Sequence, residues 1–230
     1  MFPVTNSTLT AEALIERVLT KYELAAPIHC QFLHFGVNDT YEVCTKSDFY
    51  YLRVYRRGWR TKGQILAEVE MLEFLGKQGL SVSVGVRRTD GGFLTRIDAP
   101  EGIRYAVLFT EAPRGKAPVR TPQFMEFGKL VAELHIAMDL RPEDKRRFHI
   151  DPHHLLDEPL RIVAPLIEHR EEDLRFLTKL ADELKSRVSA LLTRKSPEYG
   201  CIHCDIPNLH ISTDGTMTLF DFDCYGYGWR

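Results

Sequence analysis

The chain has 230 residues, which is enough for one large domain or for two small lobes that share a cleft. Hydrophobic residues make up 44% and charged residues 27%, and the formal net charge of -2 offers no basic field for nucleic acid or for an anionic membrane surface. No apolar run approaches the roughly 20 residues of a membrane span, and the 5 cysteines, an odd number, argue against a disulfide framework. The segment that starts at Met1 also lacks the basic and apolar regions of a signal peptide. We therefore expect a cytoplasmic protein with no nucleic-acid partner and no membrane partner.

The first half of the sequence predicts strands that pack with two helices. Residues 10–22 carry apolar side chains at helical spacing, and Thr10 is a suitable N-cap. Residues 62–78 form the clearest helical pattern, which ends at Gly79. Runs of apolar and β-branched residues that are bounded by turn residues predict strands at 40–44, 49–55, 82–86 and 105–109. The polar turn between the first two runs predicts an antiparallel hairpin.

The second half changes from strands to helices after the structure-breaking segment Glu111-Ala112-Pro113-Arg114-Gly115, so we place a lobe boundary between residues 112 and 113. Helices are expected from Thr121, over 159–169 and over 171–192. The buried stripe of the first of these helices is expected to contain Phe124, Phe127, Val131, Leu134 and Met138. Residues 199–203 and 216–223 are expected to form a short pair of strands. This order predicts an α+β fold with a β-rich front lobe and a mainly helical back lobe.

The densest group of reactive residues lies after residue 200. The segment Cys201-Ile202-His203-Cys204-Asp205-Ile206-Pro207-Asn208-Leu209-His210 is followed by Asp221-Phe222-Asp223. Phosphoryl transfer needs such residues, because one carboxylate orients the attacking hydroxyl and accepts its proton, while an asparagine and a second aspartate hold Mg²⁺. Oxygen ligands suit Mg²⁺ because it is a hard cation. Either motif alone is more typical of a capped turn or a strand end, but the two together favour a catalytic site.

These motifs resemble those of the aminoglycoside phosphotransferase family, which includes choline-kinase-like and type II homoserine-kinase-like enzymes with a two-lobed protein-kinase-like fold. The family loop reads His-Gly-Asp-x-x-x-x-Asn and the family metal motif reads Asp-x-Asp, often followed by a Gly-Tyr-Gly-Trp-like stretch. The corresponding residues here are His203-Cys204-Asp205, Asn208, Asp221-Phe222-Asp223 and Gly226-Tyr227-Gly228-Trp229. The resemblance implies that Asp205 is the catalytic base and that His203 supports the loop. It also implies that Asn208 and Asp221 are Mg²⁺ ligands, with Asp223 as a further metal-site candidate.

The resemblance implies an activity as well as a fold. It implies an enzyme that uses ATP and Mg²⁺ to move the γ-phosphoryl group to a hydroxyl of a small molecule, such as an amino alcohol, a sugar or an aminoglycoside. Residues 1–112 would form a nucleotide-binding N-lobe, and residues 113–230 a C-lobe that carries the catalytic and metal loops.

The loop of this chain differs from the family pattern in two ways. Asp205 and Asn208 are separated by two residues instead of four, and Cys204 stands where the family has a glycine. An ungapped alignment would place His210, a poor Mg²⁺ ligand, at the asparagine position. We prefer the gapped alignment, because it keeps the family distance between the asparagine and the Asp-x-Asp motif. A glycine before the aspartate can also reflect a backbone angle that a cysteine adopts less easily.

A kinase also needs a cation that reaches the nucleotide phosphates and a helical glutamate that holds this cation. Glu68 lies on the apolar stripe of the 62–78 helix, and Arg53 lies in the middle of the 49–55 strand, where the family has Lys or Arg. We expect these two side chains to form an ion pair, the alternative being that each is separately exposed. The 36–40 turn resembles the loop that covers the phosphates, so Asn38 and Thr40 are further nucleotide-binding candidates.

Other interpretations stay open at the level of the sequence. Cys201-x-x-Cys204 with nearby histidines is a weak zinc pattern, because Cys201 lies in an apolar run and no second Cys-x-x-Cys pair occurs. Members of the family continue well beyond the position of Arg230, so the resemblance implies a C-terminally truncated, incomplete C-lobe whose exposed surface favours self-association. The shortened loop and this missing part favour a catalytically impaired or inactive binding module. The charged residues that match the family favour an enzyme, which is our preferred interpretation.

Overall fold

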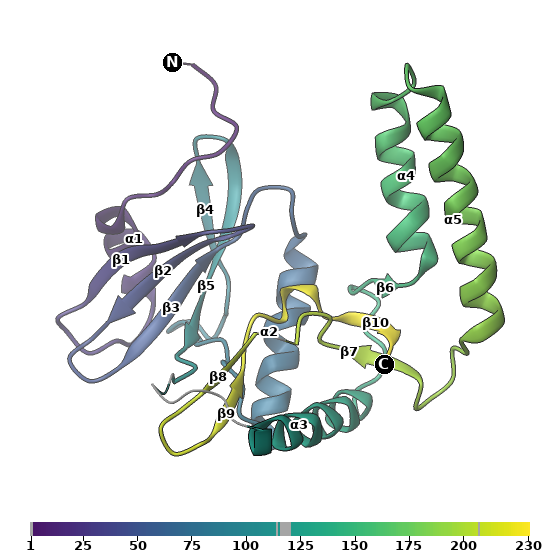
Figure 1. The fold of residues 1–230 in the computed structure, drawn as a ribbon. Coiled ribbons are helices and arrows are strands. Elements are labelled where there is room, and N and C mark those ends of the chain that lie inside the picture. The colour runs from purple at the N-terminus through teal and green to yellow at the C-terminus, as the bar shows by residue number, and fades with distance from the viewer. Residues whose placement is uncertain (1, 114, 116–120, 207) are drawn as a thin grey trace. The chain divides into compact units, whose positions relative to one another are not determined.

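The computed structural model describes residues 2–113, 115, 121–206 and 208–230, so Arg114 in the expected break and Pro207 in the expected loop lie outside the described residues (Figure 1). The chain divides into two units. Unit 1 contains residues 1–128 and 206–223, and unit 2 contains residues 129–205 and 224–230. Within the described ranges, none of the helices combines the length and the apolar character that crossing a bilayer requires. The lobe boundary between residues 112 and 113 stays a prediction.

Unit 1 is built on a five-stranded antiparallel sheet with the strand order β1-β2-β3-β5-β4. These strands are β1 (His29–Phe35), β2 (Asp39–Cys44), β3 (Phe49–Val54), β4 (Thr95–Ala99) and β5 (Gly102–Thr110). The expected hairpin is confirmed, because β2 and β3 pair from Asp39 and Val54 to Cys44 and Phe49. The two edge strands, β1 and β4, were not among the expected strands. Most of β1 is exposed, so it lacks the alternation of a half-buried strand, and β4 is short and contains an aspartate.

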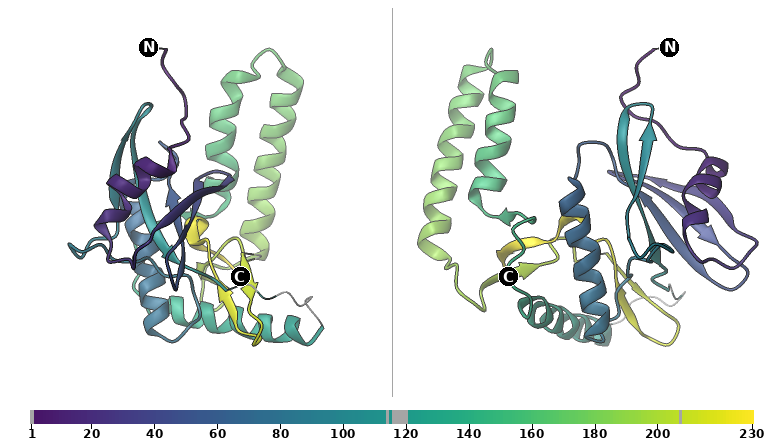
Figure 2. Two further views of the ribbon diagram at one scale, coloured as in Figure 1. Left: turned by 90° about the vertical axis from the view of Figure 1, so that its left-hand side faces the viewer. Right: turned by 180° about the vertical axis from the view of Figure 1, so that it is seen from behind.

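Two helices lie on opposite faces of this sheet, α1 (Ala11–Arg17) on one and α2 (Lys62–Lys77) on the other (Figures 1 and 2). The expected cap of α1 is confirmed, because the Thr10 hydroxyl accepts a hydrogen bond from the Ala13 amide at 3.3 Å. A 3₁₀ turn at Leu19–Lys21 completes the first helical segment. Since neighbouring side chains of a strand point to opposite faces, the residues of β3 divide between the two helices.

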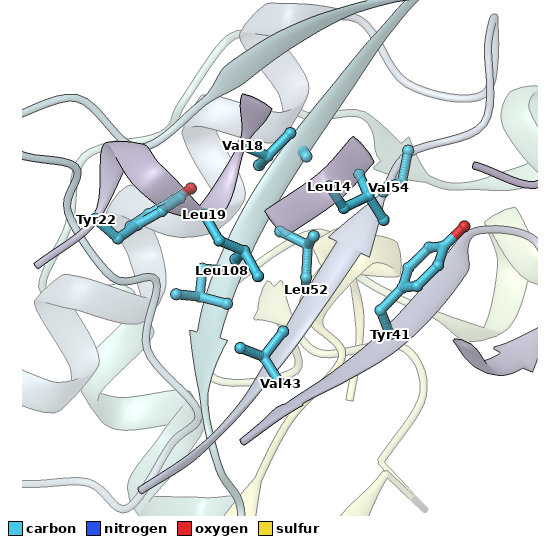
Figure 3. Close-up of a cluster of buried hydrophobic side chains, with 10 residues drawn as sticks. Leu14, Val18, Leu19, Tyr22, Tyr41, Val43, Leu52, Val54 and Leu108 are labelled. Atoms are coloured by element: carbon cyan, nitrogen blue, oxygen red, sulfur yellow. The ribbon is translucent and has the colours of Figure 1, made fainter. Parts of the chain in front are cut away.

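The face of the sheet toward α1 carries the apolar core of unit 1, whose side chains Figure 3 shows in close-up. Leucine and valine side chains of α1 and the 3₁₀ turn pack there on aromatic and aliphatic residues of β2, β3 and β5. The buried cluster consists of Leu14, Val18, Leu19, Tyr22, Tyr41, Val43, Leu52, Val54, Ala106 and Leu108. Leu52 and Val54 belong to this cluster, so Arg53 between them points to the other face, toward α2.

A two-stranded hairpin of β8 (Leu209–Ile211) and β9 (Met217–Leu219) also belongs to unit 1. The strand expected at 82–86 was wrong. Those residues form only two isolated bridges to different partners, Val82 to Leu219 and Gly85 to Phe109, so no continuous ladder can form. Backbone hydrogen bonds from Ser83 to Leu219 at 2.9 Å and from Leu219 to Ser81 at 3.0 Å fasten the hairpin to the rest of the unit.

Unit 2 contains a three-stranded sheet with the order β6-β10-β7, formed by His149–Ile150, Gly226–Trp229 and Tyr199–Ile202 respectively. The expected pairing of 199–203 with 216–223 was therefore wrong, because β7 pairs with β10 and β9 pairs with β8. The glycines explain why β10 takes the central position. A Cβ at Gly226 would lie 2.6 Å from the Phe148 carbonyl oxygen, and one at Gly228 would lie 2.7 Å from the Ile202 side chain.

The helical part of the chain is close to the expectation. α3 (Thr121–Asp139) crosses from unit 1 into unit 2, and Leu134 and Met138 of its expected stripe are buried. Phe124 is 63% exposed, contrary to the expectation, because the helix is buried only in its second half. α4 (Glu158–Val163) follows a π-helical turn at His153–Asp157 and leads through a 3₁₀ turn at Ala164–Leu166 to α5 (Glu171–Leu191). In both views of Figure 2, α4 and α5 run side by side as a helical hairpin.

Candidate active site

Arg53 stands between two carboxylates of unit 1. Its Nη1 lies 3.0 Å from Oε1 of Glu68 on α2, so the expected ion pair is confirmed. Its Nη2 lies 2.8 Å from Oδ1 of Asp221, which follows β9. Glu68 is buried, whereas 38% of the Asp221 side chain is exposed. A single guanidinium therefore joins the helical glutamate to the candidate metal motif, and Asp221 stays partly exposed to solvent.

Tyr55 is a further member of this group that the sequence analysis missed. Its hydroxyl donates a hydrogen bond to Oε2 of Glu68 at 2.8 Å, so each oxygen of Glu68 has its own donor. Burial raises the pKa of Tyr55 well above its usual range, and the Glu68 charge raises it further, so Tyr55 stays a neutral donor. The signal was its position two residues after Arg53, one residue past the end of β3, where the alternation of the strand repeats the side of Arg53.

The charge of Arg53 is maintained by its partners. Burial by itself lowers the pKa of this guanidinium, but Asp221 and Glu68 raise it, and the net pKa lies above the ordinary value. Arg53 therefore stays cationic. Thr40 lies directly opposite Arg53 in the β2–β3 ladder, and its side chain shares that face of the sheet.

The two principal metal candidates lie together in unit 1. The carbonyl oxygen of Asn208 accepts a hydrogen bond from the amide of Phe220 at 3.1 Å, which places Asn208 beside the residue that precedes Asp221. Asp221 has a φ of 63°, a left-handed conformation that is uncommon for a residue other than glycine and often occurs at functional sites. The ring of His210, by contrast, is held by the Ala112 carbonyl oxygen at 2.6 Å and packs on Phe220. These contacts support the gapped alignment with Asn208.

Asp223 and Asn38 have a different environment from Asp221. Asp223 is 5% exposed, and its carboxylate accepts from Asn38, Trp59 and Arg60. The other end of the Asn38 amide accepts from the backbone N–H of Arg56 at 3.1 Å. Both side chains thus make several contacts inside unit 1, and Trp59 and Arg60 were not among the expected site residues.

The catalytic-loop candidates lie in unit 2. His203 is fully buried, and its Nδ1 accepts a hydrogen bond from the backbone N–H of Asp205 at 3.2 Å. That His203 supports the loop during catalysis stays a prediction. Cys204 has a φ of 69°, so the glycine of the family pattern does correspond to a left-handed backbone angle here. Cys204 and Asp205 are both exposed. Asp205 belongs to unit 2 and Asp221 to unit 1.

The zinc alternative finds little support in the chemistry of its central residue. Cys201 lies on β7 with 2% of its surface exposed, and burial raises the pKa of its thiol to about 12. Zinc binds the thiolate, which this environment disfavours. Among the residues that the structure describes, no three His, Cys, Asp or Glu side chains are grouped as a ready-made metal site.

A family model described as the phosphotransferase enzyme family, APH, matches residues 30–230. The chain belongs to this family. The resemblance inferred from the loop and metal motifs is thereby confirmed, together with the α+β, protein-kinase-like fold.

The chain has relatives among curated proteins. It is 36% identical to an uncharacterized protein of Synechocystis sp. over 100% of this chain and 64% of that protein. It is 35% identical to an uncharacterized protein of Deinococcus radiodurans over 100% of this chain and 66% of that protein. It is 24% identical to amicoumacin kinase of Bacillus subtilis over 86% of this chain and 59% of that protein. The chain thus spans less than two thirds of the length of these relatives.

Solved structures share the fold of this phosphotransferase family member at low sequence identity. A microcompartment-associated aminopropanol kinase superposes with a TM-score of 0.70 at 24% identity, over 95% of this chain and 71% of that one. An amicoumacin kinase, solved in complex with AMP-PNP and Ca²⁺, superposes with a TM-score of 0.72 at 21% identity, over 95% of this chain and 65% of that one.

Proposed function

We propose that this protein is a kinase that transfers the γ-phosphoryl group of ATP to a hydroxyl of a small molecule, with Mg²⁺ as the metal. The observation that carries the proposal is the position of Arg53, whose guanidinium contacts both the helical Glu68 and the candidate metal ligand Asp221. This is the cation, helical glutamate and metal-motif carboxylate that phosphoryl transfer on a kinase fold requires. Family membership supports the same chemistry.

The residues of unit 1 would bind the nucleotide. Arg53 would neutralise phosphate charge while Glu68 and Tyr55 hold its guanidinium in place. Thr40, on the same face of the sheet, would supply a hydroxyl, and the turn between β1 and β2 would supply backbone N–H groups. The side-chain oxygens of Asn208 and Asp221 are hard donors that fit Mg²⁺, which would neutralise the charge that develops on the transferred group when it is bound.

Asp205 would act on the acceptor. Its exposed carboxylate would orient the acceptor hydroxyl and take its proton as the oxygen forms a bond to the γ-phosphorus and the bond to the β-phosphate oxygen breaks. The hydrogen bond from its backbone to the buried His203 would fix the loop during this step. As acceptors we propose amino alcohols, sugars or aminoglycosides, since two kinases of the same fold are named for aminopropanol and amicoumacin.

The test is nucleotide binding followed by turnover. A thermal-shift screen with ATP, GTP and Mg²⁺ should show stabilisation by one nucleotide, and γ-phosphate release should then respond to a panel of amino alcohols, sugars and aminoglycosides. Asp205→Asn should lower turnover by a factor of roughly 10² to 10⁴ while nucleotide still binds. Asp214→Asn, which changes an exposed carboxylate in the β8–β9 turn, is the control and should leave both unchanged.

Two outcomes would contradict parts of the proposal. Absence of nucleotide binding by the parent protein would refute the kinase assignment. Nucleotide binding without turnover on any acceptor would favour the inactive binding module, for which the left-handed Cys204 and the shortened Asp-x-x-Asn loop are the relevant observations.

A further inference from the structure

Asp223 fastens two loops of unit 1 to the metal motif. Its Oδ2 lies 2.7 Å from the indole Nε1 of Trp59 and 3.2 Å from the amide Nδ2 of Asn38. Its Oδ1 lies 2.8 Å from Nε of Arg60. The carboxylate is thus almost completely buried, and each of its oxygens accepts from at least one donor of the protein.

The three donors come from two separate loops. Asn38 lies in the turn between β1 and β2, which is the loop expected to cover phosphates, and Trp59 and Arg60 lie between β3 and α2. The loops are also joined directly, because Oδ1 of Asn38 accepts from the backbone N–H of Arg56. The Arg60 guanidinium stacks on the Trp59 ring at 4.3 Å, which orders the second loop around the carboxylate. We call Asp223, Asn38, Trp59 and Arg60 the Asp223 brace.

The brace distinguishes Asp223 from Asp221, two residues earlier. The side chain of Asp221 is 38% exposed and that of Asp223 is 7% exposed. A carboxylate that holds a metal must direct a lone pair at the cation, and a carboxylate whose oxygens already accept from an indole, an amide and a guanidinium is poorly placed to do so. The two aspartates of the motif therefore have different environments, one open and one enclosed.

We propose that Asp223 is a positioning residue for nucleotide binding and not a metal ligand: it holds the β1–β2 turn and the β3–α2 loop in the arrangement that Arg53 and Asp221 need. This inference rests on the proposed kinase function. It places Asn38 in the brace as well, so that its side chain orients the turn while the backbone amides of the turn meet phosphate. The Asp223 brace thus predicts an effect on nucleotide affinity that does not depend on metal.

The test compares nucleotide binding with and without metal. The dissociation constant for AMP-PNP is measured by calorimetry in the presence of Mg²⁺ and again in EDTA, for the parent, for Asp223→Asn and for Asp221→Asn. Asp223→Asn presents an NH₂ group to donors and removes a charge-assisted contact, so affinity should fall roughly tenfold or more in both conditions. Asp221→Asn should lower the affinity mainly when Mg²⁺ is present.

A second readout follows the brace itself. The sequence has two tryptophans, Trp59 and Trp229, so a Trp229→Phe background leaves Trp59 as the single reporter. In this background Asp223→Asn should shift the Trp59 emission maximum without nucleotide, because the negative charge that accepts from the indole N–H is removed. Trp59→Phe removes that N–H but keeps an aromatic ring. It should weaken AMP-PNP binding less than Asp223→Asn does, and it serves as the second variant if the latter folds poorly.

A matched control separates this effect from general destabilisation. Asp151 is also a nearly buried aspartate paired with an arginine, Arg194, but it belongs to unit 2. Asp151→Asn should leave AMP-PNP affinity within about twofold.

The outcomes decide between the roles of Asp223. A loss of affinity in Asp223→Asn that appears only with Mg²⁺ would show that Asp223 is a metal ligand and overturn the proposal, as would unchanged affinity in both conditions. Unchanged Trp59 emission would also overturn it. If the parent itself binds no AMP-PNP, the kinase function fails, and the emission of Trp59 still decides whether the Asp223 brace exists.

Discussion

The buried Glu68 allows a quantitative test of the Arg53 cluster. In Glu68→Gln the side chain keeps its volume, and the amide can still accept from Arg53 and donate to the Tyr55 oxygen, but both contacts lose the negative charge. A hydrogen bond to a charged group contributes about 1.5–3 kcal/mol, against about 0.5–1.5 kcal/mol for a neutral one. With roughly 1 kcal/mol lost in each of two bonds, we expect the free energy of unfolding to fall by about 2 kcal/mol.

The control for this measurement lies on the same helix. Glu73 also pairs with an arginine, Arg87, at 2.8 Å, but 26% of its side chain is exposed and water screens the pair. Glu73→Gln should therefore cost less than about 1 kcal/mol. Urea unfolding followed by far-UV circular dichroism measures both variants, and the melting temperature of Glu68→Gln should fall by about 4–8 °C. Equal costs for the two substitutions would refute the reasoning, because they would show that the charge of Glu68 is not buried against Arg53 and Tyr55 in solution.

Three other substitutions follow from the backbone and the buried charges. Cys204→Gly should raise the free energy of unfolding, measured in urea, by about 0.5–1 kcal/mol. The left-handed conformation costs a cysteine about 1–2 kcal/mol, and the greater flexibility of glycine in the unfolded chain offsets about 0.5–1 kcal/mol of this gain. A loss of stability would contradict the prediction. Arg104→Met should cost about 3–5 kcal/mol by the same measurement, because Arg104 is buried and its removal leaves Asp39 without its partner at 2.7 Å; a cost below 1 kcal/mol would exclude this buried pair. Burial raises the pKa of Cys201 to about 12, so the folded protein keeps this thiol protonated at a pH where the unfolded chain loses the proton. The stability of the folded state is therefore unaffected by this thiol below about pH 8.5 and falls as the pH rises toward 12. Unfolding measured from pH 8 to 11 should therefore show a shallower decline for Cys201→Ala than for the parent, and identical slopes would contradict the assignment.

Local patterns predicted much of unit 1 and the identity of its charged cluster. The alternation of β3 places Leu52 in the core and Arg53 on the opposite face, and the helical spacing of α2 places Glu68 on its buried stripe, so their ion pair could be predicted from two short segments. The expected angle at Cys204 followed from its position in the motif alone.

The contacts that no local pattern predicted join distant parts of the chain. Asp223 is 164 residues from Trp59 and 185 residues from Asn38. No local sequence pattern in either loop predicts that both loops donate hydrogen bonds to the same carboxylate. The predicted pairing of the strands was wrong for the same reason. The apolar runs around β7 and β9 indicated strands correctly, but their partners depended on the tight β8–β9 turn and on the close approach that Gly226 and Gly228 permit.

The division of unit 1 into two stretches of sequence has a consequence for synthesis on the ribosome. The β8–β9 hairpin bonds through Leu219 to Ser81 and Ser83, so the partner of this early segment is made only after most of the chain. At about 5–20 residues per second, the delay is on the order of 10 s. During that interval the backbone groups of residues 81–83 that later bond to Leu219 must form hydrogen bonds with water. Arg53 then faces α2 without its partner Asp221. The nascent sheet can therefore bind other polypeptide segments at the surface that later receives the metal motif. A nascent-chain experiment should find protease protection of residues 81–83 only once residue 219 has left the exit tunnel.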